Sequence, residues 1–101
     1  MKPSQLIQIH EITQQKSDGT PLRLTYCLSR QEAEESDAPL YGIYVRMQEE
    51  GREQPEEIQT PPISYSEAFV RLLLERVSAN AVTPLCLMEV LDELISTWEE
   101  A

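Results

Sequence analysis

The chain has 101 residues, of which 41% are hydrophobic and 26% charged, a length and composition typical of one folded domain rather than a disordered chain. Acidic residues outnumber basic ones by 18 to 8, giving a formal net charge of −10. That charge disfavours nucleic acids and anionic membranes as direct partners, because phosphate groups are bound by clusters of Lys and Arg.

Two strands joined by a turn are predicted first. Residues 5–13 predict a strand with Ile7 and Ile9 on one face, and residues 16–19 supply the turn of a hairpin. The return strand, residues 20–30, shows the strictest alternation of apolar and polar side chains in the chain. Its apolar face consists of Leu22, Leu24, Tyr26 and Leu28. We expect this face to point into the core.

Two further strands follow an acidic segment. Residues 31–38 contain four acids and predict a mobile loop, with a short helical turn capped by Ser29 as the alternative. Residues 40–48 predict a central strand, because apolar side chains occur on both of its faces near its start. Gly42 in this strand predicts a bulge or a close passage beneath a helix. Residues 56–60 predict a short edge strand that two prolines terminate.

Two helices complete the set of predicted elements. Residues 65–79 predict a helix announced by a capping box of Ser64 and Glu67. Residues 84–99 predict a second helix, with the hydroxyl of Thr83 as its N-cap. Because the connection between them is short, we expect the two helices to form an αα-hairpin.

These elements predict a single α+β domain over residues 1–101. We expect a four-stranded antiparallel meander followed by two antiparallel helices packed on one face of the sheet. The first residues lack the apolar stretch of a signal peptide, and no apolar run is long enough to span a membrane. We therefore expect a cytoplasmic protein that does not bind membranes.

The residue pattern indicates no catalytic, cofactor or metal site. His10, the only imidazole, lies beside Glu11 on a predicted strand, and adjacent strand residues point to opposite faces, so Glu11 cannot orient it for catalysis. Cys27 and Cys86 are far apart in the sequence and predict two buried, reduced thiols rather than a metal site. We expect a non-enzymatic protein without a cofactor.

The predicted second helix has an acidic face and no basic residue. From Val77 to the end of the chain there is no Lys or Arg, whereas five acids lie opposite the apolar arc of the helix. They are Glu89, Asp92, Glu93, Glu99 and Glu100. Like charges on one helix face repel one another, so these acids cost stability. They form either a solvated face of an acidic protein or a surface for a basic partner.

The same helix supplies the candidate contact residues for a protein partner. Trp98 lies close to the chain end, where we expect it to be only half covered and able to anchor a partner. The full set of candidate contacts is Leu91, Ile95, Trp98, Glu89, Glu93 and Glu100. It combines an apolar centre with acidic neighbours.

Three function classes remain open at this point. The favoured hypothesis is a protein–protein interaction or regulatory module whose partner is a basic protein or a second copy, the homodimer forming through an edge strand or the second helix. The alternative is an acidic inhibitor that mimics nucleic acid toward a basic enzyme, and the third class is a small enzyme or ligand carrier. Salt separates the first two, because added salt weakens binding by a mimic far more than an apolar interface.

Three segments of the chain resemble a known family. They are Tyr41-Gly42-Ile43-x-Val45, Ile63-Ser64 with Ser66 and Glu67, and Val82-Thr83-Pro84 followed by Leu87 and residues 89–93. Together they make the chain from residue 41 onward similar to a family of uncharacterised Firmicutes proteins of about this chain's length, a domain of unknown function. The resemblance implies an intracellular bacterial protein in which a strand, a capped helix and a Thr-Pro helix form the shared frame. It implies no activity, cofactor or site.

Overall fold

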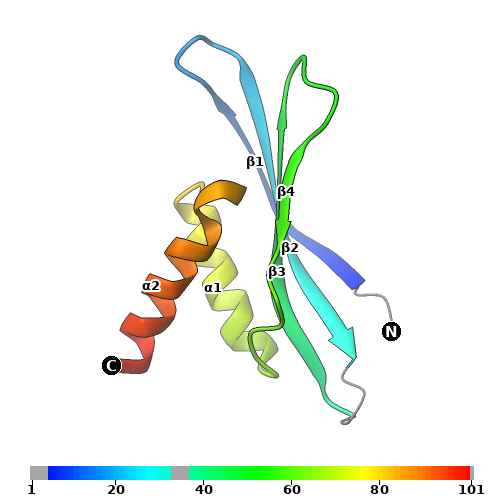
Figure 1. The fold of residues 1–101 in the computed structure, drawn as a ribbon, viewed down its shortest axis with the longest axis vertical. Helices are drawn as coiled ribbons and strands as arrows, with labels where there is room; N and C mark the ends of the chain where they lie inside the picture. The colour runs from blue at the N-terminus through cyan, green and yellow to red at the C-terminus, as the bar shows by residue number, and fades with distance from the viewer. Residues whose placement is uncertain (1–4, 33–36, 101) are drawn as a thin grey trace.

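The computed structural model describes residues 5–32 and 37–100, the side chains of residues 99 and 100 excepted. The strands are β1 (Gln5–Gln15), β2 (Pro21–Glu32), β3 (Pro39–Glu49) and β4 (Glu56–Gln59). The helical elements are α1 (Glu67–Ala79), the 3₁₀ turn η1 (Pro84–Cys86) and α2 (Leu87–Glu100). The strands form one antiparallel sheet in the order β1-β2-β3-β4, and both helices lie on one face of it (Figure 1). The predicted α+β class, meander and helix pair are confirmed.

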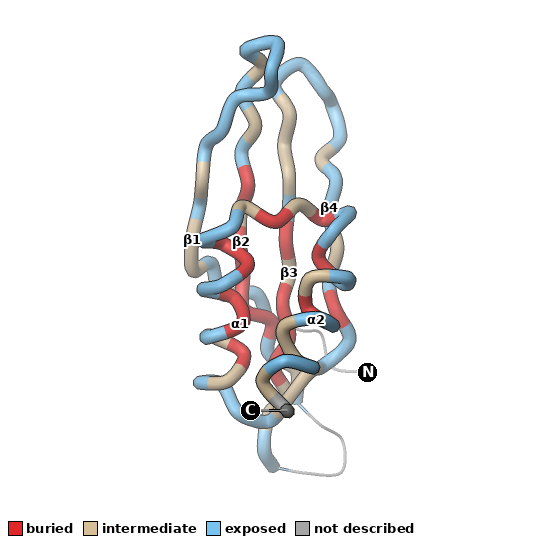
Figure 2. The backbone as a smooth tube through the Cα atoms, turned by 90° about the vertical axis from the view of Figure 1, so that its left-hand side faces the viewer, coloured by how far each residue is buried: buried red, intermediate tan, exposed pale blue. Residues whose placement is uncertain are grey.

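The core lies between the central strands and the two helices (Figure 2). The strict alternation of residues 20–30 and 40–48 places every second side chain toward the helices, as a period of two requires. The buried strand residues on the helix face are Leu24, Tyr26, Leu28, Tyr41, Ile43 and Val45. The helices add Val70, Leu73, Leu74 and Val77 from α1, and Leu87 and Leu91 from α2. Beyond the helices the two β-hairpins extend as exposed arms (Figure 1).

A shift of register in β1 explains its irregular apolar pattern. Gln8 is opposite Cys27, but His10 is already opposite Tyr26, so Ile9 is an extra residue in β1. The extra residue reverses the alternation, and Ile12 therefore lies opposite Leu24 on the helix face, the face that Ile7 shares. A strict period of two could not place Ile7 and Ile12 on one face.

The junction between the helices is fixed to the sheet. The buried hydroxyl of Tyr26 donates a hydrogen bond to the carbonyl oxygen of Val82 at 2.8 Å, and burial raises the pKa of Tyr26 to about 12. Asn80 is the C-cap of α1, and the amides of Ala81 and Val82 bond back to the carbonyls of Ser78 and Val77. These two bonds form a Schellman motif, in which Ala81 adopts the left-handed conformation with φ of 49°.

Both predicted helix starts need correction. The N-cap of α1 is Ser66, whose Oγ accepts from the amide of Phe69 at 3.2 Å, whereas the Oγ of Ser64 accepts from the amide of Ser66. The capping box of Ser64 and Glu67 is therefore wrong by two residues. Thr83 is the cap residue before η1, but its side chain makes no capping hydrogen bond. Hydroxyl residues are common at cap positions because their side chains usually accept a hydrogen bond from a backbone amide of the helix. Thr83 occupies the cap position without making this bond.

Gly42 is closely approached, although not by a helix. A Cβ atom there would lie 2.8 Å from the Oγ1 of Thr60 and 2.9 Å from the Oγ of Ser29, on the sheet face away from the helices. The same Thr60 Oγ1 accepts from the amide of Ile43 at 3.0 Å. Glycine at position 42 therefore lets the segment after β4 pack against β3. The predicted passage beneath a helix is wrong, because position 42 faces the side of the sheet that the helices do not cover.

The acidic segment 31–38 is described only in part. Strand β2 continues through Glu32, so Ser29 lies inside the strand and does not cap a helical turn. Residues 33–36, which make up half of the predicted mobile loop, lie outside the described residues. Residues 37 and 38 form a bend before β3.

Candidate interaction surface

Helix α2 is covered by the rest of the protein only along its first half. Leu87 and Leu91 are buried, whereas Leu94, Ile95 and Trp98 are half-buried. Figure 1 shows the reason, since α2 diverges from the sheet toward its C-terminus and packs mainly against α1. The second half of the apolar arc is therefore partly open to solvent.

The apolar contact candidates have different environments. Leu91 is 2% exposed and belongs to the core, so it offers no surface to a partner. Trp98 lies edge-on to the ring of Phe69 in α1, with the ring centroids 5.8 Å apart and the planes at 70°. Trp98 and Ile95 both remain half-buried against the core. Of the three residues, only Ile95 and Trp98 keep an exposed part.

The acidic contact candidates lie on the outer face of α2. Glu89, Asp92 and Glu93 are exposed, and among the described residues no ion pair includes a member of α2. The side chain of Glu100, also a candidate, lies outside the described residues. Because the sequence has no Lys or Arg after Arg76, the chain beyond α1 cannot neutralise these acids itself.

Two exposed apolar residues accompany the acids and were missed from the sequence. Leu85 is 89% exposed and Met88 is 40% exposed, in η1 and the first turn of α2. At 100° per residue, Leu85 falls on the same side of the helix as Glu89 and Asp92, which was the available signal. We call Leu85, Met88, Glu89, Asp92 and Glu93 the α2 outer patch. It combines apolar and acidic groups on one exposed face.

The cysteines occupy different environments. Cys27 is buried, and burial raises the pKa of its thiol, which keeps the thiol protonated and unreactive at neutral pH. Cys86 is exposed in η1 beside Leu85, so the prediction of two buried thiols is wrong for Cys86. Pro84 rather than Cys86 faces the core at this turn. Both cysteines are free.

His10 pairs with a different carboxylate from its sequence neighbour. Its Nε2 lies 3.2 Å from the Oε1 of Glu75 in α1, and both side chains are exposed to solvent. His10 is on the helix side of β1, opposite Tyr26, whereas Cys27 points to the other side of the sheet. The imidazole is therefore not in position to activate that thiol. Among the described residues no group of three or more potential ligands could hold a metal ion.

The sheet face away from the helices is polar. A shallow hollow of about 190 Å³ is lined there by Gln8, Glu11, Arg23, Thr25, Arg46 and Gln48. Arg23 pairs with Glu11 at 3.5 Å, with both side chains largely exposed. Beside the hollow, the hydroxyl of Tyr44 donates to Glu57, and desolvation together with this carboxylate raises the pKa of Tyr44 to about 12. The raised pKa keeps the hydroxyl of Tyr44 protonated at neutral pH.

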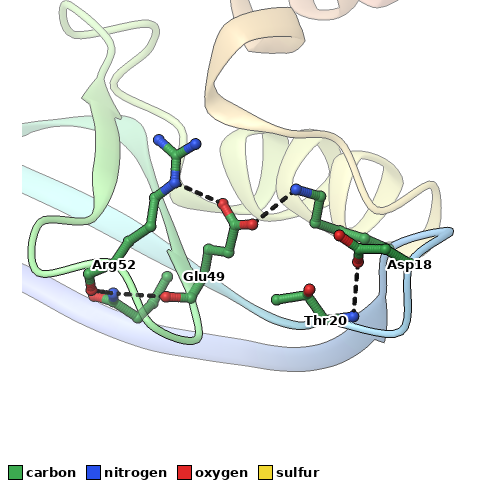
Figure 3. A network of polar contacts seen from close by, with 6 residues as sticks. Asp18, Thr20, Glu49 and Arg52 are labelled. Carbon is green, nitrogen blue, oxygen red and sulfur yellow. Dashed lines mark hydrogen bonds and ion pairs between the residues drawn. The ribbon is translucent and has the colours of Figure 1, made fainter.

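The hairpin arms are joined by a polar network (Figure 3). Glu49 accepts from the Nζ of Lys16 at 2.7 Å and from the Nε of Arg52 at 2.9 Å, so it connects the β1–β2 arm to the β3–β4 arm. The hydrogen bond between Lys16 and Glu49 raises the pKa of Lys16 and lowers that of Glu49. The side chain of Thr20 and its amide, which donates to Asp18 at 2.9 Å, both lower the pKa of Asp18. This network holds the exposed arms together where no helix covers them.

The fold and this surface define a small acidic α+β domain of four strands and two helices. The chain belongs to a family of unknown function, DUF6514, which matches residues 5–97. The resemblance to a domain of unknown function, inferred from residue 41 onward, is thereby confirmed, and the match also includes β1 and β2. No curated protein and no solved structure matches the chain. Within the described residues, neither helix has the length and apolar character needed to cross a bilayer.

Proposed function

We propose that this protein is a non-enzymatic, cytoplasmic bacterial interaction module that binds a basic protein through the α2 outer patch. The observation that carries the proposal is the exposure of Leu85 and Met88 among three carboxylates that form no ion pair within the described part of the chain. Exposed apolar side chains next to uncompensated acids cost both solvation and repulsion in the free protein. A partner with apolar and basic side chains would remove both costs.

The division of roles within the patch follows from its chemistry. Leu85 and Met88 would supply the apolar contact, and methionine adapts readily to irregular surfaces. Glu89, Asp92 and Glu93 would steer a basic partner and fix its orientation, a contribution that salt weakens. Ile95 and Trp98 would extend the contact toward the end of the helix. The buried Leu91 would act only by holding α2 in place.

The proposal is tested by capture from a lysate of the source organism at low and high ionic strength. Leu85→Ser should abolish capture of the same protein, whereas Leu72→Ser should leave it intact, because Leu72 is also exposed, at 59%, but lies on α1. Replacing Glu89, Asp92 and Glu93 with their amides should weaken capture mainly at low salt. The captured protein should carry a basic surface.

Two outcomes would contradict the proposal. Capture that survives Leu85→Ser but is lost with the amide variant and with added salt would favour the alternative, an acidic mimic of nucleic acid. Capture that neither variant changes would place the contact elsewhere on the protein. Folding of each variant should be checked by thermal denaturation, and both leucine variants should melt close to the wild type because the side chains are exposed.

A further inference from the structure

The two edges of the sheet differ in how well they resist pairing with another strand. Strand β4 has only four residues, carries Glu56 and Glu57, and is followed by Pro61 and Pro62. Short length, charge and proline are the devices by which proteins block an exposed edge. Strand β1 has 11 residues, and it contains no Pro, Lys or Arg. Its outer edge is unpaired within residues 5–32 and 37–100.

The apolar side chains of β1 are incompletely covered. Ile7, Ile9 and Ile12 pack against the core but remain half-buried, because α1 lies over β2 and β3 rather than over the edge. In β4, only Ile58 is comparable. The edge at β1 therefore offers both free backbone groups and apolar surface.

The extra residue in β1 limits where regular pairing can occur. Residues 10–15 are paired continuously with residues 21–26 of β2, from His10 opposite Tyr26 to Gln15 opposite Pro21. This run of six residues follows the extra residue at Ile9 and continues into the exposed hairpin arm (Figure 1). Ile12 is its one apolar residue, and it points to the helix face.

Charge also favours approach of a second copy at this edge. Glu11 is the only acid in β1, and it pairs with Arg23. The acids of α2 lie on the far side, because α1 is on the β1 side of the molecule and α2 on the β4 side (Figure 2). When the β1 edges of two chains face each other, the acids of α2 in one copy therefore lie far from those in the other, which limits the repulsion between two chains of charge −10.

We propose that β1 pairs with β1 of a second copy and joins the two sheets into one continuous antiparallel sheet. A two-fold axis perpendicular to the sheet would pass beside Ile12, so that the two Ile12 side chains lie together on the helix face. His10 then lies opposite Gln14 and Glu11 opposite Thr13, so no like charges face each other directly. The contact does not involve the α2 outer patch and does not rest on the proposed function.

Sedimentation of the full chain over a concentration series tests the pairing. The wild type should form a dimer, and Ile12→Lys should make it monomeric by placing two ammonium groups in the interface. Ile58→Lys is the matched control, because it introduces the same charge at a half-buried isoleucine on the other edge, and it should leave the dimer intact. Circular dichroism of both variants should show folded protein, since a lysine at an edge can extend its ammonium group to solvent.

Hydrogen exchange on the wild type provides a test that needs no variant. Pairing should increase protection of the amides in residues 10–15 as the protein concentration rises, whereas residues 56–59 should exchange at a constant rate. A wild type that stays monomeric, exchange in residues 10–15 that does not depend on concentration, or a dimer that survives Ile12→Lys would overturn the proposal.

Discussion

The two helices contrast in how completely the fold accounts for them. Helix α1 has a side-chain N-cap at Ser66, an ion pair between Glu67 and Arg71 at 2.9 Å and a Schellman motif at its end. Its inward residues are completely buried. Helix α2 begins after a 3₁₀ turn that has no capping side chain. Among the described residues no ion pair includes its acids, and the apolar residues of its second half are only half-buried.

This contrast shows where to look for function. The side-chain cap, the ion pair and the Schellman motif of α1 each stabilise the folded chain, so folding explains these three features. The exposed Leu85 adds nothing to the core, and the acids of α2 beyond its first turn repel one another. Residues that lower the stability of the free protein are candidates for binding, because a partner can supply the contacts that the fold does not.

The largest expected effect contrasts the buried faces of the helices. Leu73→Ala in α1 should lower the free energy of unfolding by about 3 kcal/mol, because it leaves a cavity where the side chain is fully buried. Leu94→Ala in α2 should cost roughly half as much, since its half-buried side chain can be replaced by water. Urea denaturation measures both. Equal losses would show that α2 is as firmly packed as α1.

The helix starts should differ by a smaller amount. Ser66→Ala should cost about 1 kcal/mol, because it removes the hydrogen bond to the amide of Phe69. Thr83→Ala should cost clearly less, because the hydroxyl of Thr83 caps nothing. Chemical denaturation of the two variants under one set of conditions decides the point. A larger loss for Thr83→Ala would mean that its hydroxyl does cap α2 in solution.

The junction between the helices can be improved. Ala81→Gly should stabilise the protein by about 0.5 to 1 kcal/mol, because a left-handed φ is costly for any residue with a Cβ atom. Ala79→Gly is the matched control, since Ala79 lies in the last turn of α1, where glycine should destabilise. Thermal melts should therefore move in opposite directions for the two substitutions. A lower melting temperature for Ala81→Gly would show that the methyl group contributes more through packing than it costs in strain.

The parts of the molecule that local patterns determine were the parts predicted correctly. Alternation in residues 20–30 and 40–48 reports which side chains face the core, and the structure places them so. The extra residue at Ile9 could not be predicted, because it depends on pairing with β2. The position of the helix cap also depends on pairing between distant residues. Ser64 forms a bridge with Tyr41 and so belongs to the sheet, which leaves Ser66 as the N-cap of α1.

The candidate surface was predicted less completely than the fold. The acidic face of α2 followed from periodicity, and Glu89 and Glu93 are exposed as expected. Periodicity could not separate the buried Leu91 from the half-buried Ile95 and Trp98, because the divergence of α2 from the sheet is a tertiary property. The exposure of Leu85 depends on how η1 joins the sheet, which the periodicity of α2 does not report.

The smallest expected effects concern charge on the two helices. Glu93→Gln in α2 should stabilise the free protein by roughly 0.2 to 0.5 kcal/mol at low salt, because it removes repulsion from Glu89 one turn away. The gain should disappear at high salt, where such repulsion is screened. Denaturation at two salt concentrations measures this. A loss of stability would mean that Glu93 has a favourable partner within the chain.

Glu67→Gln in α1 should have the opposite sign, and its dependence on pH is diagnostic. The hydrogen bond from Arg71 lowers the pKa of Glu67, and the carboxylate also lies in the first turn of α1, where the helix dipole favours negative charge. Because the folded-state pKa is the lower one, this stabilisation is fully present above the ordinary pKa of Glu and is lost as the pH falls through the lowered value. Wild type and Glu67→Gln should therefore differ in stability near neutral pH and converge in acid. A difference that persists in acid would have to come from packing, and the contrast between a charge-balanced α1 and an unbalanced α2 would lose its electrostatic basis.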